Sequence, residues 1–356
     1  MSMSTNITRR QFVGTTAIAA TSLPWAFLRS SVPQLPMEGY LPYFPGASAW
    51  LNSQPLSKES VRGKVVLVDF WTYSCINWRR SLPFVRAWAK KYRDHGLVVV
   101  GVHAPEFPFE RDIDNVRRSA QTMMIDYPIA IDNEFAIWRA FNNDFWPALY
   151  LADKDGQIRY HKFGEGEYDQ SERVIQQLLR QAGANSFDPG LVLVDASGPE
   201  IAADWPDLRS EENYVGMNRT EGFASPGGFH ANKSHTYTSP GELKLNHWAL
   251  EGDWTASPHG IRLDADAGRI AYRFHARDLH LVMGPELPGT TIRFRVLLDG
   301  KVPTAAQGVD VDARGYGVAV EPRLHQLIRQ ERPIVDRTFV IEFLDAGIEA
   351  YSFTFG

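Results

Sequence analysis

The sequence is poor in cysteine: Cys75 is the only one in 356 residues. No disulfide can form within the chain, so any thiol–disulfide chemistry requires a sulfur from a second molecule. Cys75 and the histidines do not have the spacing of a zinc site, and the best candidate pair, His230 and His235, falls in a segment without periodicity. We therefore predict that the protein holds no metal ion and no other cofactor.

The chain also lacks a basic excess and the glycine motifs of nucleotide-binding proteins. It has 37 Lys and Arg against 42 Asp and Glu, a net charge of −5, and the basic residues are scattered. This pattern argues against a nucleic-acid partner. There is no phosphate-binding glycine loop, no dinucleotide fingerprint and no nucleophile elbow, which argues against the enzyme classes that depend on them.

Long hydrophobic runs are absent after the first 35 residues, so we expect no membrane span there. At the N-terminus, Arg9 and Arg10 precede a modestly apolar segment, residues 13–28, that Thr, Ser and Pro interrupt. This layout is typical of a twin-arginine export signal. We predict that residues 1–35 direct the protein to the periplasm, where it stays tethered to the membrane if the signal is not cleaved.

Residues 36–186 alternate between apolar strand patterns and helical patterns. The predicted strands cover residues 64–71, 97–102, 129–131, 148–152 and 158–163, and the last two form a hairpin. The predicted helices cover residues 76–92, 113–123, 135–141 and 171–181. This alternation, followed by a hairpin, indicates an α/β domain with a mixed sheet flanked by helices.

After a predicted linker at residues 187–213, the pattern changes to short alternating runs without helices. These predicted strands cover residues 260–263, 269–274, 279–282, 291–298, 317–320, 338–343 and 350–355. Residues 214–356 therefore indicate an all-β sandwich of the jelly-roll kind. We expect residues 323–329 to be the exception and to form one or two helical turns.

Cys75 lies between the predicted strand at 64–71 and the predicted helix at 76–92. Unpaired N–H groups of a first helical turn favour the thiolate, which is the reactive form of cysteine. Arg79 and Arg80 lie in the same turns and would add to this field. The alternative is a small buried apolar side chain, the commonest fate of a lone cysteine.

The segment around Cys75 resembles the thioredoxin superfamily. Asp69 precedes Cys75 by six residues, Trp78 occupies the second position of a Cys-x-x-Cys motif, and Trp146-Pro147 is similar to the family's cis-proline. The stretches FWTYSCIN, GVHAPEFPFE, WPALYLADKDG, FGEGEY and AYSFTFG resemble the soluble C-terminal part of DipZ-type cytochrome c biogenesis proteins. That part joins a thioredoxin-like domain to a β-domain likened to carbohydrate-binding modules.

The resemblance implies roles for individual residues. Cys75 would be the attacking thiol, Asp69 the buried carboxylate that relays a proton for the second cysteine, and Pro147 a wall of the substrate groove. Three tryptophans would also belong to the groove: Trp71, Trp78 and Trp146. Because a tryptophan replaces the second cysteine, an outside thiol must resolve any mixed disulfide.

Three functions are open to a thioredoxin-like protein in which Trp78 replaces the second cysteine. The first is thiol–disulfide exchange through Cys75 with a thiol or disulfide protein or a small-molecule thiol, in envelope redox maintenance or cytochrome c maturation. The second is a redox-inactive module that binds a protein or carbohydrate. The third is a one-cysteine peroxidase, since Thr72 stands three residues before Cys75 as in peroxiredoxins, although Val68 replaces their proline.

Two further groups of residues are candidates for binding or tuning. His103 and Glu106 follow the predicted strand at 97–102, where they could tune the thiolate. We favour an ordinary loop histidine and a solvated glutamate at these positions. In the β-part, four aromatic residues could stack on a sugar ring, although we favour a place in the sandwich core for them: Trp248, Trp254, Tyr272 and Tyr316.

Overall fold

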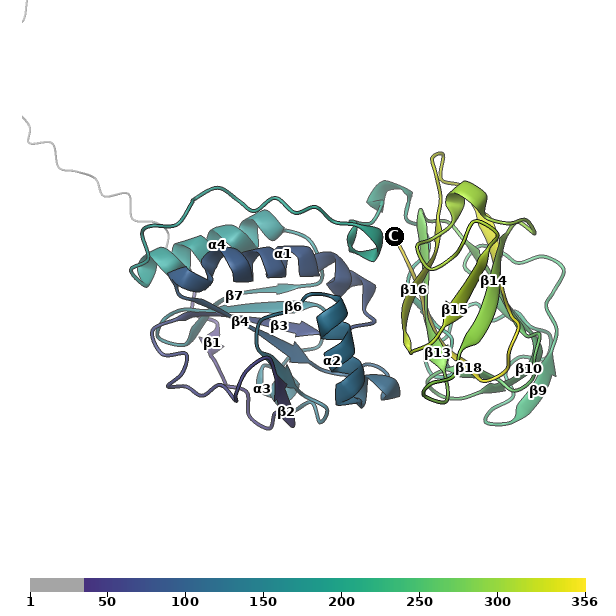
Figure 1. Cartoon of the computed structure of the whole chain (residues 1–356), viewed down its shortest axis with the longest axis horizontal. Coiled ribbons are helices and arrows are strands. Elements are labelled where there is room, and N and C mark those ends of the chain that lie inside the picture. Colours follow the sequence, from purple (N-terminus) through teal and green to yellow (C-terminus); the bar gives the residue numbers. More distant parts are fainter. Residues whose placement is uncertain (1–34) are drawn as a thin grey trace, which may run out of the picture. The chain divides into compact units, whose positions relative to one another are not determined.

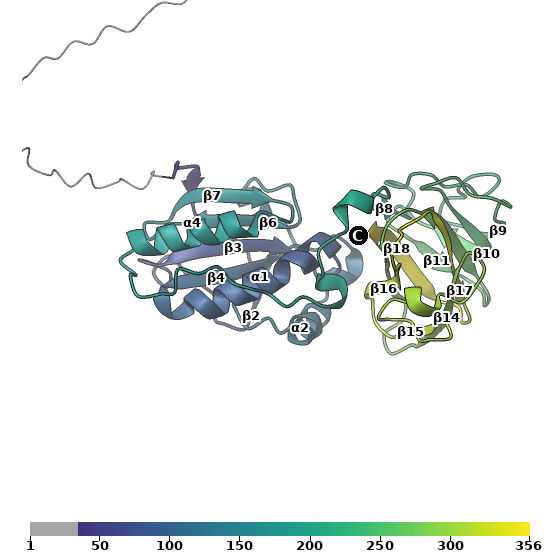
Figure 2. The same ribbon diagram turned by 90° about the horizontal axis from the view of Figure 1, so that it is seen from above.

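The computed structural model describes residues 35–356, so all but the last residue of the predicted export signal (1–35) lies outside the described part. Residues Pro36–Gly356 form one compact unit. Its first half carries a seven-stranded sheet and its second half an antiparallel β-sandwich (Figure 1, Figure 2). The predicted fold class is thereby confirmed; the predicted domain limits of 36–186, 187–213 and 214–356 stay a prediction.

The first sheet has the strand order β1-β7-β6-β3-β4-β5-β2. Its strands are β1 (Gly39–Tyr40), β2 (Ala49–Leu51), β3 (Val65–Trp71), β4 (Leu97–His103), β5 (Ile129–Ile131), β6 (Ala148–Ala152) and β7 (Gln157–Phe163). β3, β4 and β5 run parallel, whereas β6 and β7 form the antiparallel hairpin. β3 lies at the centre and is buried along its whole length, as its continuous apolar run predicts.

Helices cover both faces of this sheet. The helices are α1 (Ile76–Tyr92), α2 (Ile113–Thr122), α3 (Ala136–Ala140) and α4 (Tyr168–Gln181), with short turns η1 (Arg93–His95) and η2 (Pro108–Arg111). Figure 1 shows α1 and α4 along one face and α2 and α3 on the other. α1 directs Leu82, Val85 and Trp88 into the core, each without exposed surface.

The chain from residue 187 onward builds the β-sandwich. It begins with η3 (Gly198–Glu200) and η4 (Trp205–Asp207) and later contains η5 (Thr304–Ala306). Its strands are β8 (Asn213–Tyr214), β9 (Ser234–Tyr237), β10 (Trp248–Ala256), β11 (Ile261–Leu263), β12 (Arg269–Phe274), β13 (Asp278–Pro285), β14 (Ile292–Leu298), β15 (Tyr316–Ala319), β16 (Arg323–Arg329), β17 (Arg337–Phe343) and β18 (Ile348–Phe355).

Strand β10 joins the two sheets of the sandwich. Its first half pairs with β12, which continues through β17 and β14 to β15. Its second half pairs with β9 and β11, and β11 continues through β18 and β13 to β16. The two sheets enclose one apolar core that includes Phe294, Ile341 and Phe353.

One sequence prediction about the β-part is corrected. Residues 323–329 are a strand and not a helical turn, because β16 pairs with β13 and its five central residues are buried. Of the four aromatic candidates, Trp248, Trp254 and Tyr272 are buried in the sandwich core, which was the favoured interpretation, and have no exposed ring face to offer a sugar. Only Tyr316, which is 40% exposed, remains available to a ligand.

Candidate thiol site

Cys75 stands where β3 passes into α1. It is the N-cap residue of α1, and the backbone N–H groups of Asn77 and Trp78 interact with its sulfur. Its own carbonyl accepts the N–H of Arg79 at 3.0 Å, which closes the first helical turn. The residue is half-buried, so Cys75 is not sealed inside the core.

Trp78 is directed at β3. Its side chain has no exposed surface, and its Nε1–H donates a 2.9 Å hydrogen bond to Asp69 Oδ2. The ring also stacks on Trp71, with centroids 4.4 Å apart and an interplanar angle of 27°. The position of the second cysteine is therefore filled by an indole that belongs to the core. Because Trp71 and Trp78 are both fully buried, they do not line a substrate groove as the sequence analysis expected.

Asp69 is a buried carboxyl at the middle of the sheet. Burial raises its pKa to about 7, and the hydrogen bond from Trp78 opposes part of this rise. Its second oxygen, Oδ1, has no hydrogen-bond partner among residues 35–356. The Trp78 indole donates the hydrogen bond that compensates this buried carboxyl for the loss of water. Its single N–H can bond only one of the two carboxyl oxygens.

The loop between α3 and β6 forms the other side of the site. The peptide bond between Trp146 and Pro147 is cis. The Cys75 Sγ lies 4.0 Å from the carbonyl oxygen of Trp146. Trp146 is half-buried, and its Nε1–H donates to the carbonyl oxygen of Ala104 at 3.1 Å. Trp146 and Pro147 therefore lie beside the sulfur, as expected of groove residues.

The surroundings of Cys75 are acidic. Burial, and then the negative charges of Glu212 and Glu106, raise the pKa of the thiol well above its ordinary value, while the N–H groups of Trp78 and Asn77 act in the opposite direction. The helix N-terminus therefore does not produce the low thiol pKa that the sequence alone suggests. At neutral pH the sulfur is a thiol and not a thiolate.

Glu106 is held by two residues from the second half of the chain. Tyr214 donates a short hydrogen bond to Glu106 Oε1, and the Arg219 guanidinium lies 3.2 Å from the same oxygen. The guanidinium also stacks over the Tyr214 ring, 3.4 Å from its centroid. Burial raises the pKa of Glu106, and Tyr214 and Arg219 partly offset this effect.

Glu110, which the sequence analysis did not single out, positions the loop that carries Glu106. It has no exposed surface, accepts the hydroxyl of Ser74 at 2.5 Å, and accepts the N–H groups of Glu106 and Phe107 at 2.6 and 2.9 Å. Burial raises its pKa to about 7. Because Ser74 directly precedes Cys75, Glu110 ties the Glu106 loop to the cysteine turn. The sequence FPFE, with a proline at the first position of the turn, could have indicated that Glu110 caps the N-terminus of η2.

Comparisons with known proteins agree with this geometry. Residues 44–161 match the AhpC/TSA family, and residues 210–356 match a family described as a thioredoxin like C-terminal domain. The thiol-disulfide oxidoreductase YkuV of Bacillus subtilis is 31% identical over 141 residues, which cover 40% of this chain and 95% of that protein. The chain belongs to the thioredoxin superfamily.

This thioredoxin-superfamily chain is also similar to a larger protein. Protein DipZ of Mycobacterium tuberculosis is 35% identical over 331 residues, which cover 91% of this chain but only 44% of DipZ. The chain thus spans less than half the length of that relative. A thioredoxin-like protein solved in its oxidised form is 32% identical, with a TM-score of 0.38, over 40% of this chain and 96% of that one.

Two further candidates of this thioredoxin-superfamily site are His103 and Arg79. His103 is fully buried against the rings of Trp71 and Tyr73, and burial lowers its pKa to about 3, so the imidazole is neutral. Arg79 is partly buried, and burial lowers the pKa of its guanidinium. His103 therefore supplies no positive charge that would favour a thiolate.

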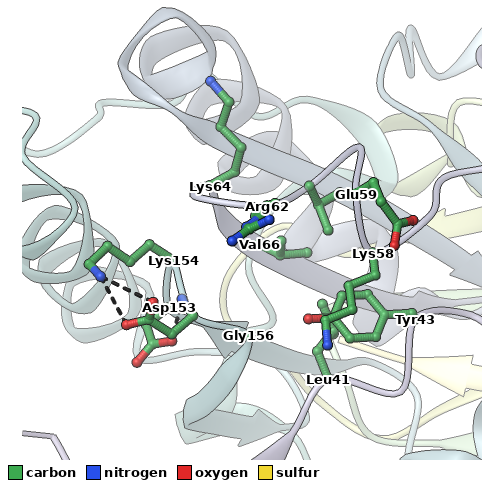
Figure 3. Close-up of a pocket in the computed structure, with 12 residues that line it drawn as sticks. Leu41, Tyr43, Lys58, Glu59, Arg62, Lys64, Val66, Asp153, Lys154 and Gly156 are labelled. Carbon is green, nitrogen blue, oxygen red and sulfur yellow. Dashed lines mark hydrogen bonds and ion pairs between the residues drawn. The ribbon is translucent and has the colours of Figure 1, made fainter.

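A cavity of about 420 Å³ is lined by charged residues of both signs, among them Glu59 and Asp153 (Figure 3). Lys58, Arg62 and Lys64 line it, together with Lys154, which is paired with the neighbouring Asp155. It includes the residues that begin β3, whereas Cys75 follows the residues that end it. This cavity is therefore separate from the thiol site.

Two kinds of feature are not found between residues 35 and 356. No helix there has the length and apolar character needed to cross a bilayer. The same residues contain no group of three or more His, Cys, Asp or Glu side chains arranged for a metal ion. The rings of His230 and His235 instead stack on each other, with centroids 3.6 Å apart.

Proposed function

We propose that this protein is an exported thiol–disulfide exchanger that works with Cys75 alone, in envelope redox maintenance or cytochrome c maturation. The observation that carries the proposal is the position of the only cysteine: the residue is half-buried at the start of α1, and its Sγ lies 4.0 Å from the carbonyl oxygen that precedes Pro147. Similarity to YkuV, which is named a thiol-disulfide oxidoreductase, supports this reaction class.

The proposed reaction has two exchange steps. The Cys75 thiol loses its proton to solvent, and Sγ displaces one sulfur of a partner's disulfide. A bond forms between Cys75 and the partner, the partner's own S–S bond breaks, and the leaving sulfur takes up a proton. An external thiol then attacks the partner's sulfur in the mixed disulfide, which releases Cys75 as a free thiol and leaves the partner joined to the external thiol through a new disulfide.

The high thiol pKa sets the pH dependence of this reaction. Exchange needs the thiolate, so its rate should rise with pH until the thiol has titrated. Thiolates of high pKa are the stronger nucleophiles once formed, but few of them exist at neutral pH. The protein should therefore be a slow exchanger at pH 7 with ordinary disulfides.

A redox-inactive binding module is the second candidate. Two observations favour it: the raised pKa of Cys75 and the conversion of the second cysteine position into core by Trp78. A one-cysteine peroxidase receives less support, because it needs a thiolate at neutral pH and because Thr72, its peroxide-orienting residue, has no exposed surface.

One experiment separates exchange from binding alone. The protein is incubated with glutathione disulfide between pH 6 and pH 10, and the mixed disulfide on Cys75 is quantified by mass spectrometry, with Cys75→Ser as the control. Exchange predicts a mixed disulfide that forms faster as pH rises and that an added thiol removes. If the wild-type protein forms no mixed disulfide even at pH 10, Cys75 is not an exchange site.

A further inference from the structure

A groove adjoins the residues that follow Cys75 in the chain. A cavity of about 390 Å³ is lined by Ile76 and Asn77, the two residues that follow Cys75, and by Phe355 near the chain end. Its remaining wall comes from η4 and the segment that follows it, residues 205–212. A second cavity of about 340 Å³ shares Arg209, Glu211 and Glu212 with the first. We call the two together the acidic groove.

The acidic groove offers one large apolar contact. Trp205 is 58% exposed and is the only tryptophan among the exposed large apolar side chains of residues 35–356. Leu208, also in the wall, is half-buried. Tryptophan is enriched among the residues that dominate binding energy at protein interfaces, because its large ring gains most from being covered.

The charge of the acidic groove is negative. Its exposed carboxylates are Glu211, Glu212 and Glu221. Of its arginines, Arg80 is buried and paired with Glu165 at 2.9 Å, and Arg219 is paired with Glu106 at 3.2 Å. Burial, and then the charge of Glu106, raise the pKa of Glu212 to about 8, so Glu212 is a carboxylate only in the alkaline range in which the thiol also ionises. In that range the lining carries three carboxylates and Arg209 as its one remaining cation.

We propose that the acidic groove receives the polypeptide that exchanges with Cys75, and that this partner carries Lys or Arg beside its reacting cysteine. This inference rests on the proposed function. The indole of Trp205 covers an apolar side chain of the partner, and the carboxylates of Glu211 and Glu212 attract its cation. Complementary charge of this kind raises the rate of encounter and selects among partners.

The test compares two cysteine peptides of equal length, one with Lys and one with Glu on both sides of the cysteine. Each peptide carries thionitrobenzoate as a mixed disulfide, and attack by Cys75 is followed through release of the coloured leaving group. At low salt and pH 9, where Glu212 is ionised, the protein should react about tenfold faster with the Lys peptide, and high salt should reduce this preference. Both results support the acidic groove.

Variants of the groove residues test whether the acidic groove causes the faster reaction with the Lys peptide. In Glu211→Gln combined with Glu212→Gln, the ratio of the two rates should fall toward one; the ratio is used because loss of Glu212 also changes the thiol itself. Trp205→Ala should slow both peptides severalfold without changing the ratio. The controls Glu242→Gln and Leu287→Ala change an exposed acid and an exposed apolar residue outside the groove lining, and should behave as wild type.

The possible failures differ. If both peptides react at equal rates, the acidic groove does not select a basic partner, whereas the proposed exchange through Cys75 still stands. A faster reaction with the mixed disulfide of glutathione and thionitrobenzoate than with either peptide overturns a longer polypeptide as the occupant, because all three then share one leaving group. No reaction of Cys75 with any of the three disulfides overturns the proposed function itself.

Discussion

At the scale of single residues, the charge on Glu106 opposes ionisation of Cys75. Glu106→Gln removes this charge but keeps an oxygen that accepts from Tyr214. We expect the pKa of Cys75 to fall, so that alkylation by iodoacetamide at pH 8 becomes about threefold faster or more, a size typical of one nearby charge at intermediate dielectric. The rate is measured against pH by mass spectrometry.

The control for this prediction is Glu242→Gln, which removes an exposed carboxylate elsewhere in the chain and should leave the alkylation profile unchanged. At acid pH, Glu106 is protonated in the wild type as well, so a charge effect predicts equal alkylation rates for the wild type and Glu106→Gln there. An unchanged profile in Glu106→Gln at pH 8 would show that burial alone sets the thiol pKa.

Trp78 and Asp69 give a second prediction at this scale. Trp78→Phe keeps a ring in the core but removes the only hydrogen-bond donor found for Asp69. Because that bond favours the carboxylate, the pKa of Asp69 should rise above its present value of about 7. The loss in free energy of unfolding should therefore be larger at pH 8 than at pH 6, on the order of 2 kcal/mol at pH 8.

Urea unfolding at the two pH values measures this difference. Trp254→Phe is the matched control: its indole is equally buried but donates to the backbone carbonyl of Glu251, which does not titrate. Its cost should be the same at both pH values. Equal costs for Trp78→Phe at pH 6 and pH 8 would mean that the indole does not control the ionisation of Asp69.

The sequence identified the residues of the site more readily than their contacts. Cys75, Asp69 and Pro147 could be picked out because they belong to one local motif series. The bond from Trp78 to Asp69 could not, because it depends on the ring turning toward β3. The contacts to Glu106 from Tyr214 and Arg219 span 108 and 113 positions in the chain, and no local pattern reports such contacts.

At the scale of elements, the first turn of α1 gives a third prediction. Trp78→Cys places a thiol one helical turn from Cys75, and we expect oxidation to form a disulfide between positions 75 and 78. The variant should gain insulin reductase activity with dithiothreitol, measured as turbidity. It should also lose about 3–5 kcal/mol of stability in urea, because the cavity left by a buried indole is large.

The wild type and Cys75→Ser combined with Trp78→Cys are the references for this assay. Each has a single thiol and cannot form the disulfide between positions 75 and 78, so both should reduce insulin much more slowly than Trp78→Cys. A variant that forms the disulfide but leaves insulin unreduced would show that the groove around Pro147 has diverged as well. A variant that forms no disulfide would show that the side chain at position 78 still points toward Asp69.

At the same scale, long strands beside a clear turn could be predicted from the sequence, whereas very short strands and β16 could not. β3, β4, β6 and β7 were predicted within a residue or so, because each is a long apolar or alternating run beside a clear turn. β1 and β2 have only two and three residues and lie in a proline-rich stretch. β16 is buried at five successive positions, so it lacks the alternation by which a half-exposed strand is detected.

At the scale of the whole molecule, Arg80 links α1 to the last strand. Its guanidinium has almost no exposed surface, pairs with Glu165 at 2.9 Å and donates to the carbonyl of Phe355 at 2.8 Å. Arg80→Met leaves the Glu165 carboxylate unpaired and partly buried. We expect a loss of about 3 kcal/mol or more in free energy of unfolding, measured in urea at pH 7.

Arg93→Met is the matched control. Its ion pair with Asp126 at 2.7 Å is exposed, with 54% and 67% of the two side chains accessible, and such pairs contribute about 1 kcal/mol at most. If both variants lost the same small amount, Arg80 would not be a structural link between the two halves of the chain.

The contact of Glu106 with Tyr214 and Arg219 has a consequence for how such proteins are dissected. A fragment that ends before residue 210 would keep Cys75 but lose the two groups that hold its acidic neighbour, together with Glu212. The cysteine of that fragment would titrate in a different electrostatic setting from the one in the intact chain. Rates obtained on an isolated N-terminal half would therefore describe another nucleophile, however well that half folded.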